Sequence, residues 1–202
     1  HTHPSAQAPF GMIQLGPNTR YEGWDGCGGY HYTDSAMYGF SCTHLSGTGV
    51  SDYGDLLMLP YSSPTKEGDH IKFFKEDEHA QAGYYACILD DGTRIEATAG
   101  DRTGILRIRF GEGGEPGIMI DLNFRDRVLK KSFEATGIGE WQGSRISEGW
   151  AREQHFYFGL EITARPDTAI EVSDGVYWIP MPEGTRETTV RMGMSGTSEQ
   201  GA

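Results

Sequence analysis

Short runs in which apolar and polar side chains alternate recur along most of the sequence, and this period of two constrains the fold most strongly. In the clearest run, residues 155–163, four apolar side chains would share one face of a strand: Phe156, Phe158, Leu160 and Ile162. Turn-forming residues separate the runs, as Asp90-Asp91-Gly92 does between two of them. This pattern is typical of antiparallel sheets joined by tight turns.

Strands are expected over residues 12–15, 56–59, 83–89, 94–99, 104–110, 117–122, 127–133, 155–163, 169–172, 176–180 and 188–194. Pro60 is expected to end the second of these, and Ser198 is a candidate helix cap. No long helical period is present. The sequence therefore predicts an all-β fold, a large antiparallel β-sandwich forming one domain over residues 1–202.

The stretch from Gly23 to Pro60 interrupts the alternation, reading GWDGCGGYHYTDSAMYGFSCTHLSGTGVSDYGDLLMLP. Closely spaced glycines favour turns and close backbone approach rather than a long helix or a regular strand. Aromatic, imidazole and carboxylate groups stand among them. Flat apolar faces and fixed polar groups on a loop are what a polyhydroxylated ligand needs.

Charge and cysteine content narrow the class of protein. The net charge is −12, from 17 basic and 29 acidic residues, which argues against a nucleic acid or an anionic membrane surface as partner. No apolar run approaches membrane-spanning length. Three cysteines without a CxxC pair make neither a disulfide framework nor a structural zinc site, and a Cys27–Cys42 bridge stays open.

Other chemistry is weakly indicated by the same stretch. The segment HLSGTG (44–49) lacks the phosphate-loop spacings, and Ser46 lacks the nucleophile elbow. A metal cluster of His1, His3, His31 and His44 has no HxxxH spacing. Asp34, Asp52 and Asp55 are oxygen ligands suited to calcium, but the DxDxDG spacing is absent, and loop capping explains them equally well.

Two features bear on sugar chemistry. Trp24 and the neighbouring tyrosines either stack on sugar rings or fill the core with a polar tip outward. Asp25, Asp52 and Asp55 are of the right type for an inverting glycosidase, which needs two carboxyl groups roughly 6.5–9.5 Å apart. Sequence spacing does not establish that separation, so the residues alone assign no catalytic pair.

Four segments resemble the N-terminal domain of glycoside hydrolase family 92: PFGMIQLGPNT (9–19), GWDGCGGYHYTDS (23–35), YGFSCTHLSGTGVSDYGDLLMLP (38–60) and VRMGMSGTSEQGA (190–202). Weaker matches (GYYACIL, IEATAGDRTGILRIRF and SRISEGWA) follow in family order, so the resemblance covers essentially the whole chain. The sequence departs from the family pattern at His3, Ser5 and Cys42, where an aromatic residue, a glycine and a histidine are usual.

The resemblance implies a calcium-dependent exo-α-mannosidase, similar to α-1,2-mannosidases, that inverts the anomeric carbon. It implies a sandwich of the supersandwich type followed by an (α/α)6 barrel, which is expected after residue 202. The catalytic acid, the catalytic base and the calcium ligands are implied to lie in that barrel, so none is expected in this chain. The implied partners are a mannose-containing glycan, such as an N-glycan, and the barrel domain, and the implied location is periplasmic or secreted. No charged n-region with an apolar h-region follows His1, so export is neither indicated nor excluded.

The resemblance gives residues 23–60 a supporting role in the mannose pocket. It implies stacking for Trp24, hydroxyl hydrogen bonds for Asp25, His31 and His44, and loop fixation or contact for Thr48 and Asp52. Two alternatives stay open. One is a free-standing carbohydrate-binding sandwich without catalysis, and the other is a docking module whose motif region is only a domain interface.

Overall fold

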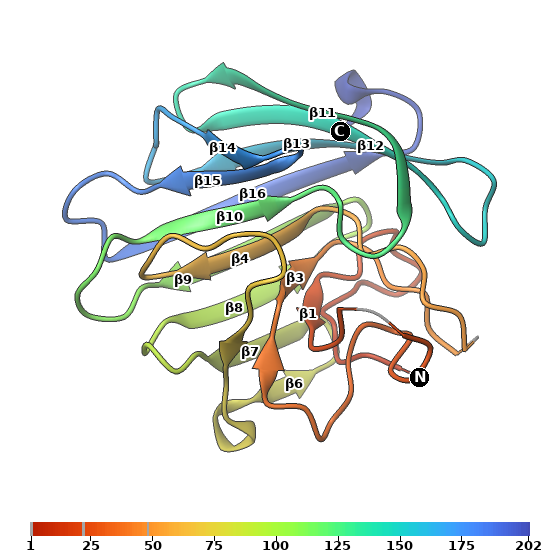
Figure 1. The fold of residues 1–202 in the computed structure, drawn as a ribbon, viewed down its shortest axis with the longest axis horizontal. Coiled ribbons are helices and arrows are strands. Elements are labelled where there is room, and N and C mark those ends of the chain that lie inside the picture. The colour runs from red at the N-terminus through yellow and green to blue at the C-terminus, as the bar shows by residue number, and fades with distance from the viewer. Residues whose placement is uncertain (1, 22, 48) are drawn as a thin grey trace.

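The computed structural model describes residues 2–21, 23–47 and 49–202, and its strands form two large antiparallel sheets packed face to face (Figure 1). The larger sheet has eight strands, in the order β11 (Arg127–Gly137), β12 (Glu140–Glu148), β13 (Gln154–Ile162), β16 (Glu187–Ser195), β9 (Thr103–Arg109), β8 (Arg94–Ala99), β7 (Tyr84–Ile88) and β6 (His79–Gln81). The smaller sheet has six, in the order β1 (Gly16–Asn18), β3 (Gly39–Ser41), β4 (Leu57–Tyr61), β10 (Gly117–Asp121), β15 (Val176–Pro180) and β14 (Ile170–Ser173). A two-stranded ribbon pairs β2 (Ala36–Met37) with β5 (Ile71–Lys72).

The all-β antiparallel sandwich expected from the sequence is confirmed. Within the described residues the only helical turns are two short 3-10 segments, η1 (Lys75–Asp77) and η2 (Glu199–Gly201). Ser198 precedes η2, but its side chain makes no capping hydrogen bond. No helix in the described ranges is long and apolar enough to cross a membrane.

Alternation in the sequence corresponds to burial in the larger sheet. Along β13 the side chains of Phe156, Phe158, Leu160 and Ile162 are buried, whereas His155 and Glu161 on the other face are exposed. Strand β9 alternates in the same way, with Leu106 and Ile108 inward. These inward side chains meet those of β4, β10 and β15 from the smaller sheet and form one core.

Two strand predictions are wrong in detail. The strand expected over 12–15 is not formed: β1 begins at Gly16, and Leu15 makes only an isolated bridge with Ala6. Ile13 and Leu15 are nevertheless fully buried, because an irregular segment carries them into the core. Pro60 does not end β4, which runs on to Tyr61. The pairing of β3 with β4 is confined to Met58, so no β3 residue pairs with the proline, which has no N–H to donate.

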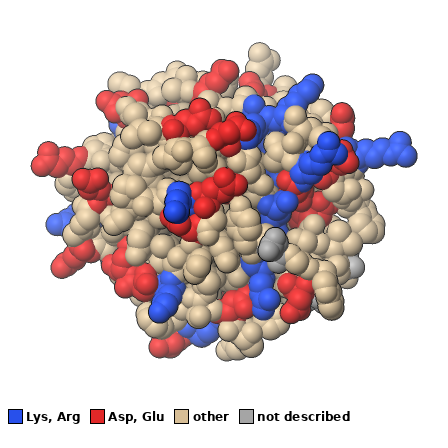
Figure 2. Space-filling model, in the orientation of Figure 1, with Lys and Arg blue, Asp and Glu red and all other residues tan. Residues whose placement is uncertain are grey.

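Most of the long segments outside regular strands lie at one end of the sandwich. The N-terminal segment, the Gly-rich stretch before β4, the β10–β11 connection and the β12–β13 connection all lie on the right of Figure 1. We call this the loop end. Acidic and basic side chains are interspersed over the face shown in Figure 2, so the net negative charge is not concentrated in one patch there.

Candidate functional site

The Gly-rich stretch ends in a backbone segment of unusual conformation. Tyr53, Gly54 and Leu56 have φ angles of 71°, 84° and 56°. These angles lie in the left-handed region, which residues other than glycine rarely adopt. Such a backbone persists only where surrounding contacts hold it. Within this segment Asp55 makes the most hydrogen bonds, and it is fully buried.

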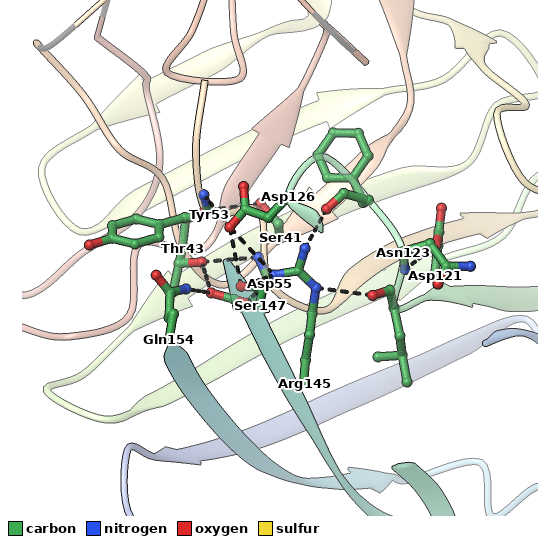
Figure 3. A network of polar contacts seen from close by, with 12 residues as sticks. Ser41, Thr43, Tyr53, Asp55, Asp121, Asn123, Asp126, Arg145, Ser147 and Gln154 are labelled. Carbon is green, nitrogen blue, oxygen red and sulfur yellow. Dashed lines mark hydrogen bonds and ion pairs between the residues drawn. The ribbon is translucent and has the colours of Figure 1, made fainter. Parts of the chain in front are cut away.

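A buried arginine from the larger sheet binds this segment (Figure 3). Arg145 of β12 has no exposed side-chain surface, and its Nη1 donates to Asp55 Oδ1 at 2.5 Å. Its other nitrogens donate to main-chain carbonyls of the β10–β11 connection, Leu122 O at 3.0 Å and Phe124 O at 2.7 Å. Arg145 thus ties three separate parts of the chain together beneath the loop end.

Asp55 uses its second oxygen as well. Its Oδ2 accepts hydrogen bonds from Thr43 Oγ1 at 2.6 Å and from Gln154 Nε2 at 2.5 Å. Its backbone N–H donates to Thr43 Oγ1 at 3.0 Å. All the polar atoms of Asp55 are therefore engaged within the protein, as a buried carboxylate requires.

Asp126 is a second carboxyl group in this network, and it is incompletely satisfied. Its Oδ2 accepts from the backbone N–H of Tyr53 at 3.0 Å and from Ser147 Oγ at 3.3 Å. Its Oδ1 is buried without a hydrogen-bond partner among the described residues. Burial raises the pKa of Asp126 to about 8; Arg145 lowers it, and nearby Asp52 raises it. Burial thus favours the protonated form of Asp126 against the opposing effect of Arg145.

Asp52 connects the Gly-rich stretch to the β12–β13 connection. Its Oδ2 accepts from the backbone N–H of Trp150 at 2.6 Å, and its side chain is buried. Gly149 lies so close that an added Cβ would stand 1.9 Å from Asp52 Oδ1. The geometry of Asp52 is that of loop fixation, one of the two roles expected for it, and the bond places Trp150 at the loop end with 66% of its surface exposed.

His44 is buried and neutral. Its Nδ1 donates to Gln14 O at 2.9 Å, its backbone N–H donates to Gln14 Oε1 at 2.9 Å, and its ring stacks on His3 at 4.6 Å. Burial lowers the pKa of His44 well below its usual value, and burial also lowers the pKa of His3 to about 4. His44 therefore offers a neutral imidazole rather than a cation.

A cleft of about 480 Å³ opens beside these groups. His44, Tyr53, Asp55, Gln154, His155 and Met12 are among the residues that line it. The cleft joins the Gly-rich stretch, the N-terminal segment and the start of β13. Its lining combines apolar side chains with a few oriented polar groups, which is the composition of small-ligand sites.

The remaining predicted site residues lie on the outer part of the same stretch. Trp24 is 69% exposed, and Asp25 is exposed with its Oδ2 3.9 Å from Arg20 Nη1. The backbone N–H of His31 donates to Thr19 Oγ1 at 2.8 Å. Residues 19 and 20 therefore hold both Asp25 and His31, whereas His44 and Asp52 belong to the inner group. Thr48 lies outside the described residues.

The described ranges contain no geometry that supports the metal site or the disulfide considered from the sequence. Asp34 binds Arg20 through Oδ2 at 2.6 Å, so it is engaged like Asp52 and Asp55. Within the described ranges, which leave out His1, no group of three His, Cys, Asp or Glu side chains is arranged to hold a metal ion. Cys27, Cys42 and Cys87 are all buried, and the Cys27–Cys42 disulfide that the sequence leaves open is not formed in the described part of the chain.

Sequence reasoning missed Arg145, Asp126 and Trp150. Arg145 was hidden because the inward face of β12 also carries Gly143 and Ser147, so the alternation there is weak. An arginine at an inward position of a strand is the one local signal that a buried partner exists. Which carboxylate it meets depends on contacts across 90 residues.

Comparison with known proteins places the chain in context. The sequence model of the "Glycosyl hydrolase family 92 N-terminal domain" matches residues 1–195. A family GH92 alpha-mannosidase from Bacteroides thetaiotaomicron is 28% identical with a TM-score of 0.88, over 100% of this chain and 32% of that one. A family GH92 inverting mannosidase from the same organism, at 21% identity, has a TM-score of 0.81 over 98% of this chain and 29% of that one, a likeness of fold.

A curated relative from Arthroderma benhamiae is described as an uncharacterized secreted glycosidase. It is 28% identical over 138 residues, which are 60% of this chain and 18% of that protein. The chain therefore spans 32% or less of the length of each of these relatives.

Proposed function

Because the chain belongs to the family of glycosyl hydrolase family 92 N-terminal domains, we propose that it is the N-terminal sandwich of an exo-acting α-mannosidase. In this proposal the loop end forms part of the wall around the terminal mannose. The observation that carries it is the contrast within the loop end. Exposed aromatic and polar groups of residues 23–60 stand on a backbone fixed from below by the buried Arg145–Asp55 network.

The roles proposed for this chain are binding and orientation. Trp24 presents an aromatic face on which a sugar ring stacks. In this proposal Asp25 and His31 form hydrogen bonds with sugar hydroxyls, and the cleft beside His44 takes the remainder of the ligand. Fixed groups of this kind lower the entropic cost of orienting the substrate.

The proton chemistry is assigned to residues outside this chain. Asp55 and Asp52 are engaged by Arg145, Thr43, Gln154 and Trp150, so neither is free to act as a general acid or base. Inversion would use one carboxylic acid and one carboxylate of the following barrel domain. Calcium, held there by oxygen ligands, would supply a hard cation for the sugar hydroxyls.

Two alternatives make different predictions. A free-standing carbohydrate-binding sandwich would bind mannosides as the 202-residue chain alone. A docking module would bind no sugar, and loop substitutions would leave catalysis by the whole protein unchanged. We also propose that the protein acts outside the cytoplasm, supported by the secreted relative.

The test is the kinetics of the full natural protein on an aryl α-mannoside. Trp24→Ala should lower kcat/KM at least tenfold through KM, whereas Trp24→Phe should retain most of it. Ile138→Ala removes an exposed apolar side chain from the β11–β12 turn and serves as the control. If all three variants stay within twofold of the parent enzyme, the pocket role is lost. Calorimetric titration of the 202-residue chain with methyl α-mannoside separates the two alternatives.

A further inference from the structure

The outward face of the larger sheet carries a trough that the loop end does not share. Gly159 of β13 and Gly193 of β16 are cross-strand partners, and both point away from the core. Their row continues to Gln142 on one side and Thr103 on the other. Two adjacent residues without side chains leave a hollow of about 530 Å³, lined by residues of five strands, β9, β11, β12, β13 and β16.

The two rows beside the glycines differ in character. On one side stand Ser132, Ser144, Tyr157 and Ser195, which are three small hydroxylated side chains and one half-buried tyrosine. On the other side stand Glu161, Arg191 and Ile105, which form a taller wall. Ile105 is 39% exposed although it is apolar. The trough therefore has one edge of serine hydroxyls interrupted by Tyr157 and a second edge with an uncovered apolar side chain.

The C-terminal segment of the sequence enters this trough over the edge that carries the serines. Segment η2 packs on β12, β13 and β16, and Ser132 Oγ donates to Glu199 Oε1 at 3.2 Å. Ser195 Oγ is buried and accepts from the backbone N–H of Thr197 at 3.1 Å. Ala202 reaches the glycine floor, where a Cβ added to Gly193 would stand 2.7 Å from its carbonyl carbon.

We propose that the residues directly following Ala202 in the natural protein lie in this trough and cover Ile105, so that the outer face of the larger sheet fixes the path of the chain toward the next domain. The inference rests on the part of the proposed function that places this chain in a longer protein. That part is supported by the solved relatives, of which the chain covers 32% and 29%. It does not depend on any sugar contact at the loop end.

The chemistry of the trough defines what the segment must be. The glycine floor admits backbone or one bulky side chain, and Ile105 favours an apolar one. Glu161 and Arg191 are paired at 3.1 Å, and Glu140 and Glu199 also line the trough, so its lining is acidic. Covering an exposed apolar side chain with a continuous strand of the same chain costs less entropy than binding a separate molecule.

Cysteine accessibility tests this inference without any enzymatic readout. Ile105→Cys places a thiol in the trough, and Arg109→Cys places one on the same face of the same strand, outside it. The three natural cysteines are buried and should react slowly. We expect the reaction of Cys at 105 with a maleimide to be at least tenfold slower in the full natural protein than in the 202-residue chain. The control at 109 should differ by less than twofold.

A second pair of variants identifies what covers the thiol. Gly193→Ala would push Ala202 out of its seat and should restore the fast reaction at 105 in the full protein. Gly159→Ala should not, because its Cβ would lie 4.0 Å from the nearest Ala202 atom. Equal rates in the two chain lengths, protection that survives Gly193→Ala, or a natural protein that stops at Ala202 would each overturn the proposal. Loss of the mannosidase proposal alone would leave these rates unchanged.

Discussion

The molecule uses arginine–carboxylate pairs in two opposite ways. On the outer face of the larger sheet Arg191 pairs with Glu161 at 3.1 Å, and the two side chains are 58% and 50% exposed. At the loop end Arg145 pairs with Asp55, and neither side chain is exposed. The outer pair joins neighbouring strands whose register the core already fixes, whereas the buried pair joins segments that no regular strand pairing connects.

This difference means that the exposed pair adds little to the stability of the fold, whereas the buried pair holds the loop end in place. A solvated pair gains little, because water screens the attraction and two long side chains must be ordered. A buried pair costs desolvation that only complete hydrogen bonding offsets, so removing one partner leaves an uncompensated charge. Arg145 meets that condition with donors to Asp55, Leu122 and Phe124. A side chain from the opposite sheet therefore supplies the cation that the strained segment 53–56 needs, beside the hydrogen bonds from Thr43 and Gln154.

The largest effect is expected for Arg145→Met. The change leaves Asp55 buried without its cation and frees two main-chain carbonyls, so unfolding in urea should require about 3–5 kcal/mol less free energy. Arg191→Met, the matched change in the exposed pair, should cost within about 1 kcal/mol. Similar losses for both variants would show that burial does not distinguish the two pairs.

The change of the unfolding free energy per pH unit comes next in size. The pKa of Asp126 is about 8 in the folded protein and about 3.9 in an unfolded chain. Between these values the folded state binds a proton that the unfolded state lacks. The unfolding free energy contributed by this group therefore falls as pH rises from about 4 to about 8, by at most about 1.4 kcal/mol per pH unit.

The measurement compares urea unfolding of the parent and Asp126→Asn at several pH values. The amide is uncharged at every pH, so the variant should lose this part of the slope and gain stability relative to the parent toward pH 8. Asp174→Asn, an exposed carboxyl beside Lys131, is the control and should keep the parental slope. Parallel pH profiles for the parent and Asp126→Asn would contradict the protonated state.

The same contrast explains which features of the structure could be predicted from the sequence. The alternation in β9 and β13 is local, because each residue's face follows from its immediate neighbours, and it located those strands correctly. The Gly-rich stretch was correctly expected to be mostly loop, since only the short strands β2 and β3 interrupt it before β4. The partners of Asp52 and Asp55 were not predictable, because Trp150 and Arg145 are 98 and 90 residues away in the chain. The prediction that Pro60 ends the strand was wrong for a related reason. β4 tolerates the proline because β3 pairs with β4 only at Met58.

A smaller loss is expected for Gly149→Ala. The new Cβ would stand 1.9 Å from Asp52 Oδ1, so the carboxylate must move and the bond to the Trp150 N–H is broken. Overpacking of this kind costs about 1–3 kcal/mol, read from urea unfolding. Gly196→Ala, whose Cβ would meet nothing closer than 3.9 Å, should be nearly neutral. A neutral Gly149→Ala would mean that the Asp52–Trp150 link is not rigid.

The smallest effect belongs to the exposed pair itself. Glu161→Gln keeps the size of the side chain and removes the charge opposite Arg191, so stability should change by less than about 1 kcal/mol. The difference should shrink further in 1 M salt, where the Debye length is about 3 Å. The Arg145→Met loss should persist in the same salt, because no solvent reaches that pair. Salt dependence measured on the two variants therefore tests the contrast directly, and a salt-sensitive loss at Arg145 would break it.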